Sequence, residues 1–288
     1  MEPLSVNAKK WFYFVSITSI IIKCFLAYFF PLTGDEAYYI DVSRSPALGF
    51  YDQPPMITWW LSFLMLFSKN LFFLRLPALL MGNVISIFVL AFLKPYDEKK
   101  AYLVAILYLI TPLHFMFPVM VTDVPLVIFS VMATFTFWRA VSQNSVFNYF
   151  FSGAFLGAAF LSKYLMAALF LAFLLYFLLQ KSHKRNYLGF AVLLLSSLPF
   201  ALIHFYWNYQ NCWINFIFNV YTRNASESFR VSNVLQFVLF QVYLMTPFLI
   251  YYVYKSKREI LFKLKDPFFF VPTLHFFFAN DGLFYGFI

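Results

Sequence analysis

Charged residues are scarce in this chain. Asp, Glu, Lys and Arg make up only 11% of its 288 residues, whereas a soluble domain carries about a quarter. Hydrophobic residues make up 62%, and the mean hydropathy is +0.75. A soluble fold of this size cannot bury so many apolar side chains. The composition therefore excludes a soluble globular protein and indicates one embedded in a membrane.

Cysteine is also scarce, and alternating strand patterns are missing. The two cysteines, Cys24 and Cys212, make neither a disulfide framework nor a metal site. Transmembrane barrels need short segments in which polar and apolar residues alternate, and the apolar runs here do not alternate. Lipid offers backbone groups no hydrogen-bond partner, so the spanning segments must be helices. The predicted fold class is an all-α, polytopic helical bundle.

Long apolar runs recur along the whole chain. Each run of about 20 residues can cross a hydrocarbon core of about 30 Å as a helix. The runs predict about nine crossings, two of them short helices within the stretch 149–179. The other predicted crossings are residues 11–30, 72–93, 101–118, 122–141, 187–206, 234–254 and a last one that begins at residue 268.

Lysine and arginine gather between these runs rather than in one patch. This is the positive-inside pattern of a multi-pass membrane protein, and it predicts an inner-membrane protein with a cytoplasmic N-terminus. The net charge of +9 is therefore explained without nucleic acid as a partner. The basic residues are Lys9, Lys10, Lys94, Lys99, Lys100, Arg139, Lys181, Lys184, Arg185, Lys255, Lys257, Arg258, Lys263 and Lys265.

The stretch 149–179 is too long for one upright helix and short for two. Arg139 and the basic cluster 181–185 both prefer the inner side, so an even number of crossings should separate them. Two short helices with Ser162, Lys163 and Tyr164 at their outer tip satisfy this. The alternative is one tilted helix, which would bury Lys163 near mid-membrane at a cost of about 3 kcal/mol or more.

Acidic residues number only 12, and this topology places Asp123 and four others on the outer side. The four lie in the outer loop 32–71, which is too polar to span the membrane and too apolar to float free. We expect short amphipathic helices on the membrane surface there, one of them with Pro55 in its first turn. The four acids of this loop are Asp35, Glu36, Asp41 and Asp52.

Most of these polar residues also have a purely structural explanation. Thr33 with Glu36 three residues later fits a capping box, and Asp123 fits the N-cap of the following helix. Lys163 can extend to the interface as an ordinary snorkelling lysine. Asp35 is harder to explain in this way, because a helix cap does not require a second acid.

Five segments occur in this order along the chain: GDEAYYIDVSRSPALGFYDQPPMITWW, LRLPALLMGN, TDVPLVIF, GAAFLSKY and LPFALIHFYWN. Together they resemble the bacterial branch of the protein O-mannosyltransferase and lipid A aminoarabinose transferase superfamily. The resemblance covers residues 11–254. Members are GT-C glycosyltransferases, which move a sugar from a polyprenyl-phosphate carrier to an acceptor at the outer face of the membrane.

The resemblance implies roles for several acidic and basic residues. It implies that Asp35 is the catalytic carboxylate, that Asp123 faces the same cavity and that Lys163 lies near it. Together with Glu36, the two aspartates form the predicted catalytic set. The implied partners are a polyprenyl-phosphate sugar donor, a lipid, glycan or protein acceptor, and the lipid bilayer.

The chemistry of such a transfer requires these residue types. An acceptor hydroxyl that attacks the anomeric carbon needs a base within hydrogen-bond reach, for which Asp35 is the candidate. The leaving lipid phosphate needs cations, and Lys163, Arg75 and Arg44 are candidates. A divalent cation held by Glu36 or Asp123 is the alternative. The remaining candidates would line the substrate cavity, and they are Tyr38, Tyr39, Tyr51, Asp52, Gln53 and Trp59.

Two departures from the family pattern keep other functions open. Gln53 stands where relatives often carry Lys or His, which removes one cation from the donor site. Relatives usually continue well past residue 288, so residues 1–288 would be a single glycosyltransferase domain that lacks its C-terminal part and could be inactive. A transporter or flippase for a lipid-linked sugar and a noncatalytic subunit are alternatives. The outer-surface acids and the lack of a visible repeat favour the enzyme.

Overall fold

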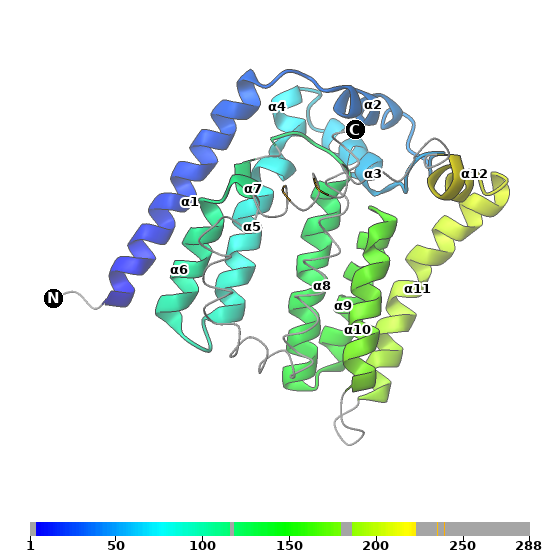
Figure 1. Cartoon of the computed structure of the whole chain (residues 1–288). Coiled ribbons are helices and arrows are strands. Elements are labelled where there is room, and N and C mark those ends of the chain that lie inside the picture. The colour runs from blue at the N-terminus through cyan, green and yellow to red at the C-terminus, as the bar shows by residue number, and fades with distance from the viewer. Residues whose placement is uncertain (1–3, 116–117, 180–185, 223–234, 236–238, 240–288) are drawn as a thin grey trace. The chain divides into compact units, whose positions relative to one another are not determined.

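The computed structural model describes residues 4–115, 118–179, 186–222, 235 and 239 (Figure 1). Every regular element in these ranges is helical, and none is a strand. The prediction of an all-α fold is thereby confirmed for the described part of the chain. The predicted crossing 234–254, apart from residues 235 and 239, and the predicted crossing from residue 268 lie outside the described residues.

In the part of the chain that the structure describes, four helices are long and apolar enough to cross a membrane. They correspond to the predicted crossings 11–30, 72–93, 122–141 and 187–206, so the chain has the organisation of a multi-pass membrane protein. The four spans are Asn7–Phe29, Leu71–Leu93, Asp123–Gln143 and Tyr187–Gln210.

The predicted crossing 101–118 is shorter than expected. Helix α6 (Glu98–Leu109) has 12 residues, or about 18 Å at 1.5 Å per residue, which is less than the thickness of a hydrocarbon core. The chain then turns into the four-residue α7 (Pro112–Phe115). Pro112 explains the end of α6, because a proline cannot donate a backbone hydrogen bond and its ring disfavours helical geometry at the preceding residue.

The stretch 149–179 contains two helices with a break between them. Helix α9 (Val146–Phe160) is followed by the 3-10 turn η1 (Tyr164–Met166) and by α10 (Ala167–Leu179). Lys163 lies at the break in an extended conformation, with φ of −164° and ψ of 141°. The structure thus has the two short helices that the charge pattern favours, with the break at the predicted residues, and not a single tilted helix.

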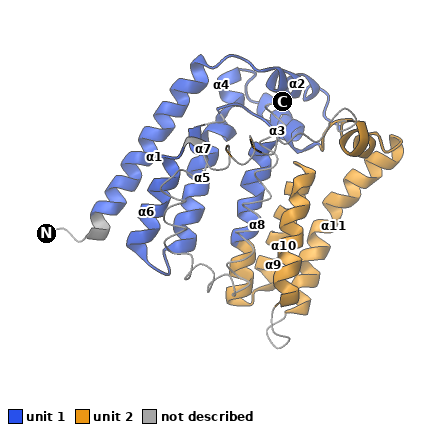
Figure 2. Cartoon of the chain, viewed as in Figure 1, with its two compact units in different colours: residues 1–47, 55–135 blue, residues 48–54, 136–288 orange. Residues whose placement is uncertain are grey.

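The described chain forms two compact units, which Figure 2 distinguishes by colour. Unit 1 consists of residues 1–47 and 55–135, and unit 2 of residues 48–54 and 136–288. The short segment 48–54 is therefore grouped with a part of the chain that begins more than 80 residues later, at residue 136. It belongs to the outer loop 32–71, whose other residues are in unit 1.

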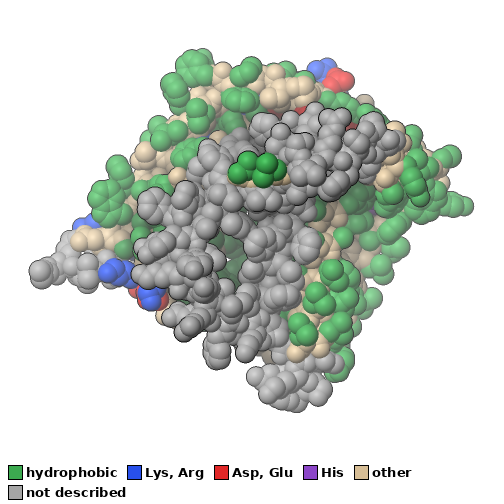
Figure 3. All heavy atoms as spheres, in the orientation of Figure 1, with side chains coloured by type: hydrophobic (Ala, Val, Ile, Leu, Met, Phe, Trp, Pro, Cys, Tyr) green, Lys and Arg blue, Asp and Glu red, His purple; other side chains and the backbone are tan. Residues whose placement is uncertain are grey.

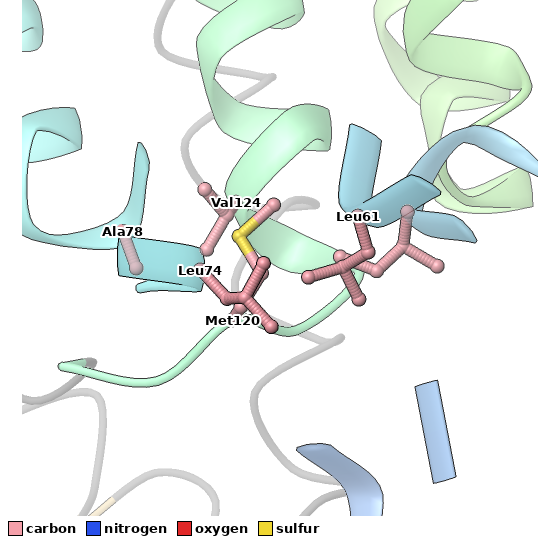
Figure 4. Packing of buried hydrophobic residues seen from close by; sticks show 6 residues of the cluster. Leu61, Leu74, Ala78, Met120 and Val124 are labelled. Atoms are coloured by element: carbon pink, nitrogen blue, oxygen red, sulfur yellow. The ribbon is translucent and has the colours of Figure 1, made fainter. Parts of the chain in front are cut away.

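In unit 1, three helices pack side by side: α1 (Leu4–Phe29), α5 (Leu76–Leu93) and α6 (Figure 1). The short helices α2 (Gly34–Val42), α3 (Met56–Met65) and α4 (Leu71–Leu74) complete the unit with the first part of α8 (Asp123–Gln143). One core cluster joins α3, α4 and α5 to the start of α8 (Figure 4). Its buried members are Ile57, Leu61, Leu74, Ala78, Met120 and Val124.

In unit 2, α9 packs closely along α11 (Tyr187–Gln210). A Cβ atom on Gly153 would lie 2.0 Å from the carbonyl oxygen of Leu193, and one on Gly157 would lie 2.6 Å from the ring of Phe200. Two glycines four residues apart thus let the helix backbones approach, as is common between membrane helices. After α11 the chain forms α12 (Ile214–Ile217) and the π-helical turn η3 (Phe218–Thr222).

Large apolar side chains remain exposed along the long helices. Hydrophobic side chains make up most of the coloured surface in Figure 3, and charged side chains occur there in a few small groups. Lipid can cover such a surface, whereas water would make it an aggregation liability. The exposed residues of α1 include Trp11, Phe14, Ile17, Ile21, Phe25 and Tyr28, and those of α11 include Leu188, Leu195, Leu202 and Tyr206.

Candidate functional site

The Asp-Glu pair lies in the first turn of α2. The Thr33 hydroxyl accepts a hydrogen bond from the Glu36 backbone N–H at 3.3 Å, which caps the start of this helix. The two neighbouring acids have opposite environments, since Asp35 is exposed and Glu36 is completely buried. The positive end of the helix dipole stabilises negative charge in this turn.

A buried ion pair joins Glu36 to Arg75. Nε of Arg75 donates to Oε1 of Glu36 at 2.8 Å, and Nη2 donates to Oε2 at 2.5 Å. Both side chains are at most 1% exposed. The backbone N–H of Met120 donates to the same Oε1 at 3.1 Å. A bidentate geometry with an additional donor is what a charge pair needs in order to remain stable away from water.

The other donors of Arg75 bind the end of α1 and the residues after it. Nη1 donates to the carbonyl oxygens of Ala27 at 2.7 Å and Phe30 at 2.8 Å, and Nη2 also donates to that of Pro31 at 3.0 Å. With the two bonds to Glu36, all five N–H groups of the guanidinium are engaged. Arg75, at the α4–α5 junction, thus connects α1 and α2. Glu36 connects α2 to the segment before α8 through Met120.

The Glu36–Arg75 pair was not foreseen from the sequence. The capping-box interpretation is right for Thr33, but the Glu36 carboxylate binds Arg75 and Met120 instead of completing the box. Arg75 was predicted to bind phosphate, and Glu36 was predicted to belong to the catalytic set, with a divalent cation held by Glu36 or Asp123 as an alternative. In this structure protein groups take up every guanidinium donor and contact both carboxylate oxygens. The partners are 39 positions apart, and no local pattern connects them.

Asp123 was predicted to be the N-cap of α8. In the structure it is the first residue of the helix, one position after the N-cap. It is half-buried, and its neighbour Val124 is fully buried in the core cluster of unit 1. Tyr39 and Ile40 of α2 pack against the same cluster. The fold therefore brings the helix that carries Asp35 and the start of α8 to one hydrophobic cluster.

Four other predicted site residues lie on the outer loop within unit 1. Nε of Arg44 is 3.6 Å from Oδ1 of Asp41, and both side chains are more than 70% exposed. The half-buried rings of Tyr38 and Tyr39 are tilted toward each other with centroids 5.5 Å apart. The indole Nε1 of Trp59 donates to the Ala47 carbonyl at 2.7 Å, which joins α3 to the residues after α2.

The remaining predicted site residues belong to unit 2. Tyr51, Asp52 and Gln53 lie in the segment 48–54, and Lys163 lies at the break between α9 and η1. The Tyr51 ring makes an edge contact with Phe218 at 5.1 Å between centroids. Gln53 is buried, whereas Asp52 and Lys163 are half-buried.

A buried polar network in unit 2 was missed at the sequence level. The Tyr164 hydroxyl donates to Oδ1 of Asn215 and lies 2.5 Å from Nε2 of His204. Nδ2 of Asn208 lies 3.1 Å from the same His204 nitrogen. The side chains of His204, Asn208 and Asn215 are completely buried. The available signal was a histidine and an asparagine four residues apart, on one face of an otherwise apolar helix.

Within the part of the chain that the structure describes, no group of three or more His, Cys, Asp or Glu side chains is placed to hold a metal ion. Of the two predicted metal ligands, Glu36 has both oxygens in contact with N–H donors, so a cation would have to compete with Arg75. Asp123 is the other candidate.

The profile of the dolichyl-phosphate-mannose-protein mannosyltransferase family matches residues 52–207, more than half of the chain. The matched region contains Asp52, Arg75, Asp123 and Lys163 and begins after Asp35. No curated protein and no solved structure matches the chain. On the strength of the matched region and the apolar helices that contain most of it, the chain belongs to the dolichyl-phosphate-mannose-protein mannosyltransferase family.

Proposed function

We propose that this protein transfers a sugar from a polyprenyl-phosphate carrier to a hydroxyl group of a lipid, glycan or protein, with Asp35 as the general base. Family membership supports a glycosyltransferase that uses a lipid-linked donor. One observation carries the choice of base: Asp35 is exposed beside Glu36, whose carboxylate is buried and held by Arg75. The backbone next to Asp35 is therefore fixed, while its own carboxylate faces outward.

The reaction is a substitution at the anomeric carbon of the sugar. The acceptor oxygen forms the new bond to that carbon as its proton moves to Asp35, and the bond to the phosphate oxygen breaks with its electron pair. A base must lie within about 3 Å of the hydroxyl in the reactive complex. Direct displacement inverts the anomeric centre, so a product that retains the donor configuration contradicts this mechanism.

The leaving phosphate gains negative charge, which basic side chains must stabilise. We assign this role to Lys163 and Arg44. Arg44 is exposed and only loosely paired with Asp41, so it can turn to a phosphate at little cost. Arg75 contributes by holding Glu36 and the α2 backbone. Asp123 completes the catalytic set, either directly or through a divalent cation.

The same proposal includes the membrane arrangement. The N-terminus would be cytoplasmic in a bacterial inner membrane, about nine helices would cross, and residues 1–288 would act as one catalytic domain. The outer loop 32–71 would lie at the outer surface with α2 and α3 along the interface. The two short helices α2 and α3, with 9 and 10 residues, are the segments that this proposal assigns to the interface.

The decisive experiment measures transfer of radiolabelled sugar from polyprenyl-phosphate donors to a membrane extract by the purified protein. Asp35→Asn should reduce transfer by about 10²-fold or more, because general-base catalysis contributes about 10² to 10⁴. Asp41→Asn is the matched control, since Asp41 is an exposed acid of the same helix. It should leave transfer within about twofold.

Two outcomes would contradict the proposal. Equal transfer by the Asp35→Asn variant and the wild type would remove Asp35 as the base. Translocation of the lipid-linked sugar across proteoliposomes, without transfer to any acceptor, would instead identify a transporter.

A further inference from the structure

The segment 48–54 is held against unit 2 by specific contacts. The Asn215 side-chain amide donates to the Phe50 carbonyl at 2.6 Å, and the Asn219 amide donates to the Asp52 carbonyl at 3.0 Å. A Cβ atom on Gly49 would lie 2.5 Å from the indole of Trp207, so only glycine permits this approach. These contacts fix the backbone on both sides of Tyr51.

The amide that holds Phe50 is itself held by the buried network. Tyr164 donates to Oδ1 of Asn215, which orients the amide so that Nδ2 points to the loop. His204 and Asn208 contact this network on the side of α11. In a buried environment each hydrogen bond restricts its neighbour, because a misplaced polar group would lose its partner without gaining water. The loop position is thus linked through Asn215 to the break after α9.

The side chain that this loop carries into the interior is Gln53. It is 5% exposed, and neither Nε2 nor Oε1 has a hydrogen-bond partner within the described structure. A hydrogen bond from the Phe50 N–H to the Gln53 carbonyl, at 3.2 Å, joins the two ends of this four-residue part of the loop. Buried polar groups without partners are uncommon and destabilising. A buried amide without partners is therefore expected where a bound ligand supplies the missing hydrogen bonds.

The chemistry of a primary amide discriminates between two parts of a lipid-phosphate sugar. Its NH₂ group only donates hydrogen bonds and its oxygen only accepts them. A phosphate oxygen can satisfy the NH₂ group but leaves the amide oxygen unpaired. A hydroxyl group can donate and accept, so the hydroxyls of a sugar ring can satisfy both ends of Gln53.

We propose that the network of Tyr164, His204 and Asn215 positions the 48–54 loop so that the Gln53 amide binds hydroxyl groups of the donor sugar rather than the donor phosphate. This inference rests on the proposed function, because it assigns a residue to part of that donor. It makes Gln53 a specificity-determining residue and the network a set of positioning residues.

The ligand assignment is tested with Gln53→Ala and Gln53→Lys. Both variants should raise the KM for the donor by about tenfold, the effect of losing one or two buried hydrogen bonds, with a smaller change in kcat. Inhibition by polyprenyl phosphate without a sugar should stay within about twofold of wild type, because that ligand lacks the recognised hydroxyls. If Gln53→Lys binds polyprenyl phosphate more tightly and the KM for the donor does not rise, Gln53 belongs to the phosphate site and the proposal is overturned.

The positioning role is tested without any substrate. In a background with Cys24→Ser and Cys212→Ser, a reporter Gln53→Cys is labelled with a maleimide in detergent micelles. Adding Asn215→Leu or Tyr164→Phe should accelerate labelling about tenfold or more. The first change removes the bond to the Phe50 carbonyl, and the second removes the bond that orients Asn215. Asn211→Leu is the control, because the Asn211 side chain is exposed and bonds only locally to the Trp207 carbonyl.

The two experiments fail in different ways. Equal labelling rates in the Asn215→Leu, Tyr164→Phe and control proteins would overturn the positioning role whatever the enzyme does. Absence of donor binding and transfer by the wild type would remove the proposed function, and the sugar assignment of Gln53 with it.

Discussion

Two buried polar clusters hold parts of the outer loop 32–71, and they do so by different chemistry. In unit 1 a charged pair, Glu36 and Arg75, holds the start of α2. In unit 2 a neutral set that includes Tyr164 and Asn215 holds the segment 48–54. Each cluster lies close in sequence to a residue with a proposed role: Glu36 is next to Asp35, and Tyr164 is next to Lys163.

The difference between them follows from the cost of burying charge. An ion pair in an apolar interior is stable only if nearly every donor and acceptor is used, and all five N–H groups of Arg75 are used. A neutral network tolerates gaps, since a missing hydrogen bond costs about 1–3 kcal/mol. The charged cluster is therefore complete and structural, while the neutral region contains buried polar atoms on Gln53 and Asn208 without a hydrogen-bond partner among the described residues.

The largest expected effect comes from breaking the charged cluster. Arg75→Met should lower the free energy of unfolding by about 3–5 kcal/mol, because the Glu36 carboxylate remains buried without its partner. Unfolding of the purified protein by denaturant in mixed micelles would measure this loss. A loss below 1 kcal/mol would show that the pair is open to water and refute the comparison.

A double-mutant cycle should separate the pair from its surroundings. Glu36→Gln with Arg75→Met should lose about 1–3 kcal/mol less than the sum of the single variants, because the second change removes the stranded charge. The same unfolding assay supplies all four values. Strict additivity would contradict a direct ion pair between the two side chains.

Glycine at position 49 should matter more than glycine at position 34. Gly49→Ala should lower the free energy of unfolding by about 1–3 kcal/mol, because the new Cβ would collide with the indole of Trp207. Gly34→Ala should have an effect of no more than about 1 kcal/mol, since no atom lies within 4 Å of a Cβ placed there. Equal effects would mean that the 48–54 loop does not pack on Trp207.

The neutral network should be weaker per bond than the charged cluster. Tyr164→Phe should lower the free energy of unfolding by about 1 kcal/mol, the usual value for one neutral hydrogen-bonded group. Tyr149→Phe, at a buried tyrosine of the same unit, provides a comparison for the loss of a hydroxyl. A loss as large as that of Arg75→Met would remove the distinction between the clusters.

The smallest effect is expected at the exposed ion pair. Arg44→Met should change the free energy of unfolding by about 0.5 kcal/mol or less, because both partners remain hydrated. The same change should reduce transfer if Arg44 serves the phosphate. This variant therefore separates stability from function, whereas Arg75→Met should reduce both. Unchanged transfer would remove Arg44 from the proposed phosphate site.

Prediction from sequence succeeded where a property depends on one continuous segment. The apolar runs located the four long helices, and the charge pattern around Lys163 located the break between α9 and η1. The helix expected over 101–118 ends earlier, at Leu109. The expectation rested on the average apolarity of the run and did not take Pro112 into account. The counts of crossings and the roles of Asp35 and Asp123 stay predictions.

The sequence by itself determined the helical membrane class, the family and the approximate ends of the long helices. Hydrophobicity and helix caps act over a few neighbouring residues, so they can be read from the order of side chains. Only the tertiary structure decided that Glu36 binds Arg75 and that the loop of Gln53 is held by Asn215, 165 positions from its partner Phe50. Such pairs form because a buried polar group must find its partners among the few groups within reach, and which groups those are depends on how the helices pack.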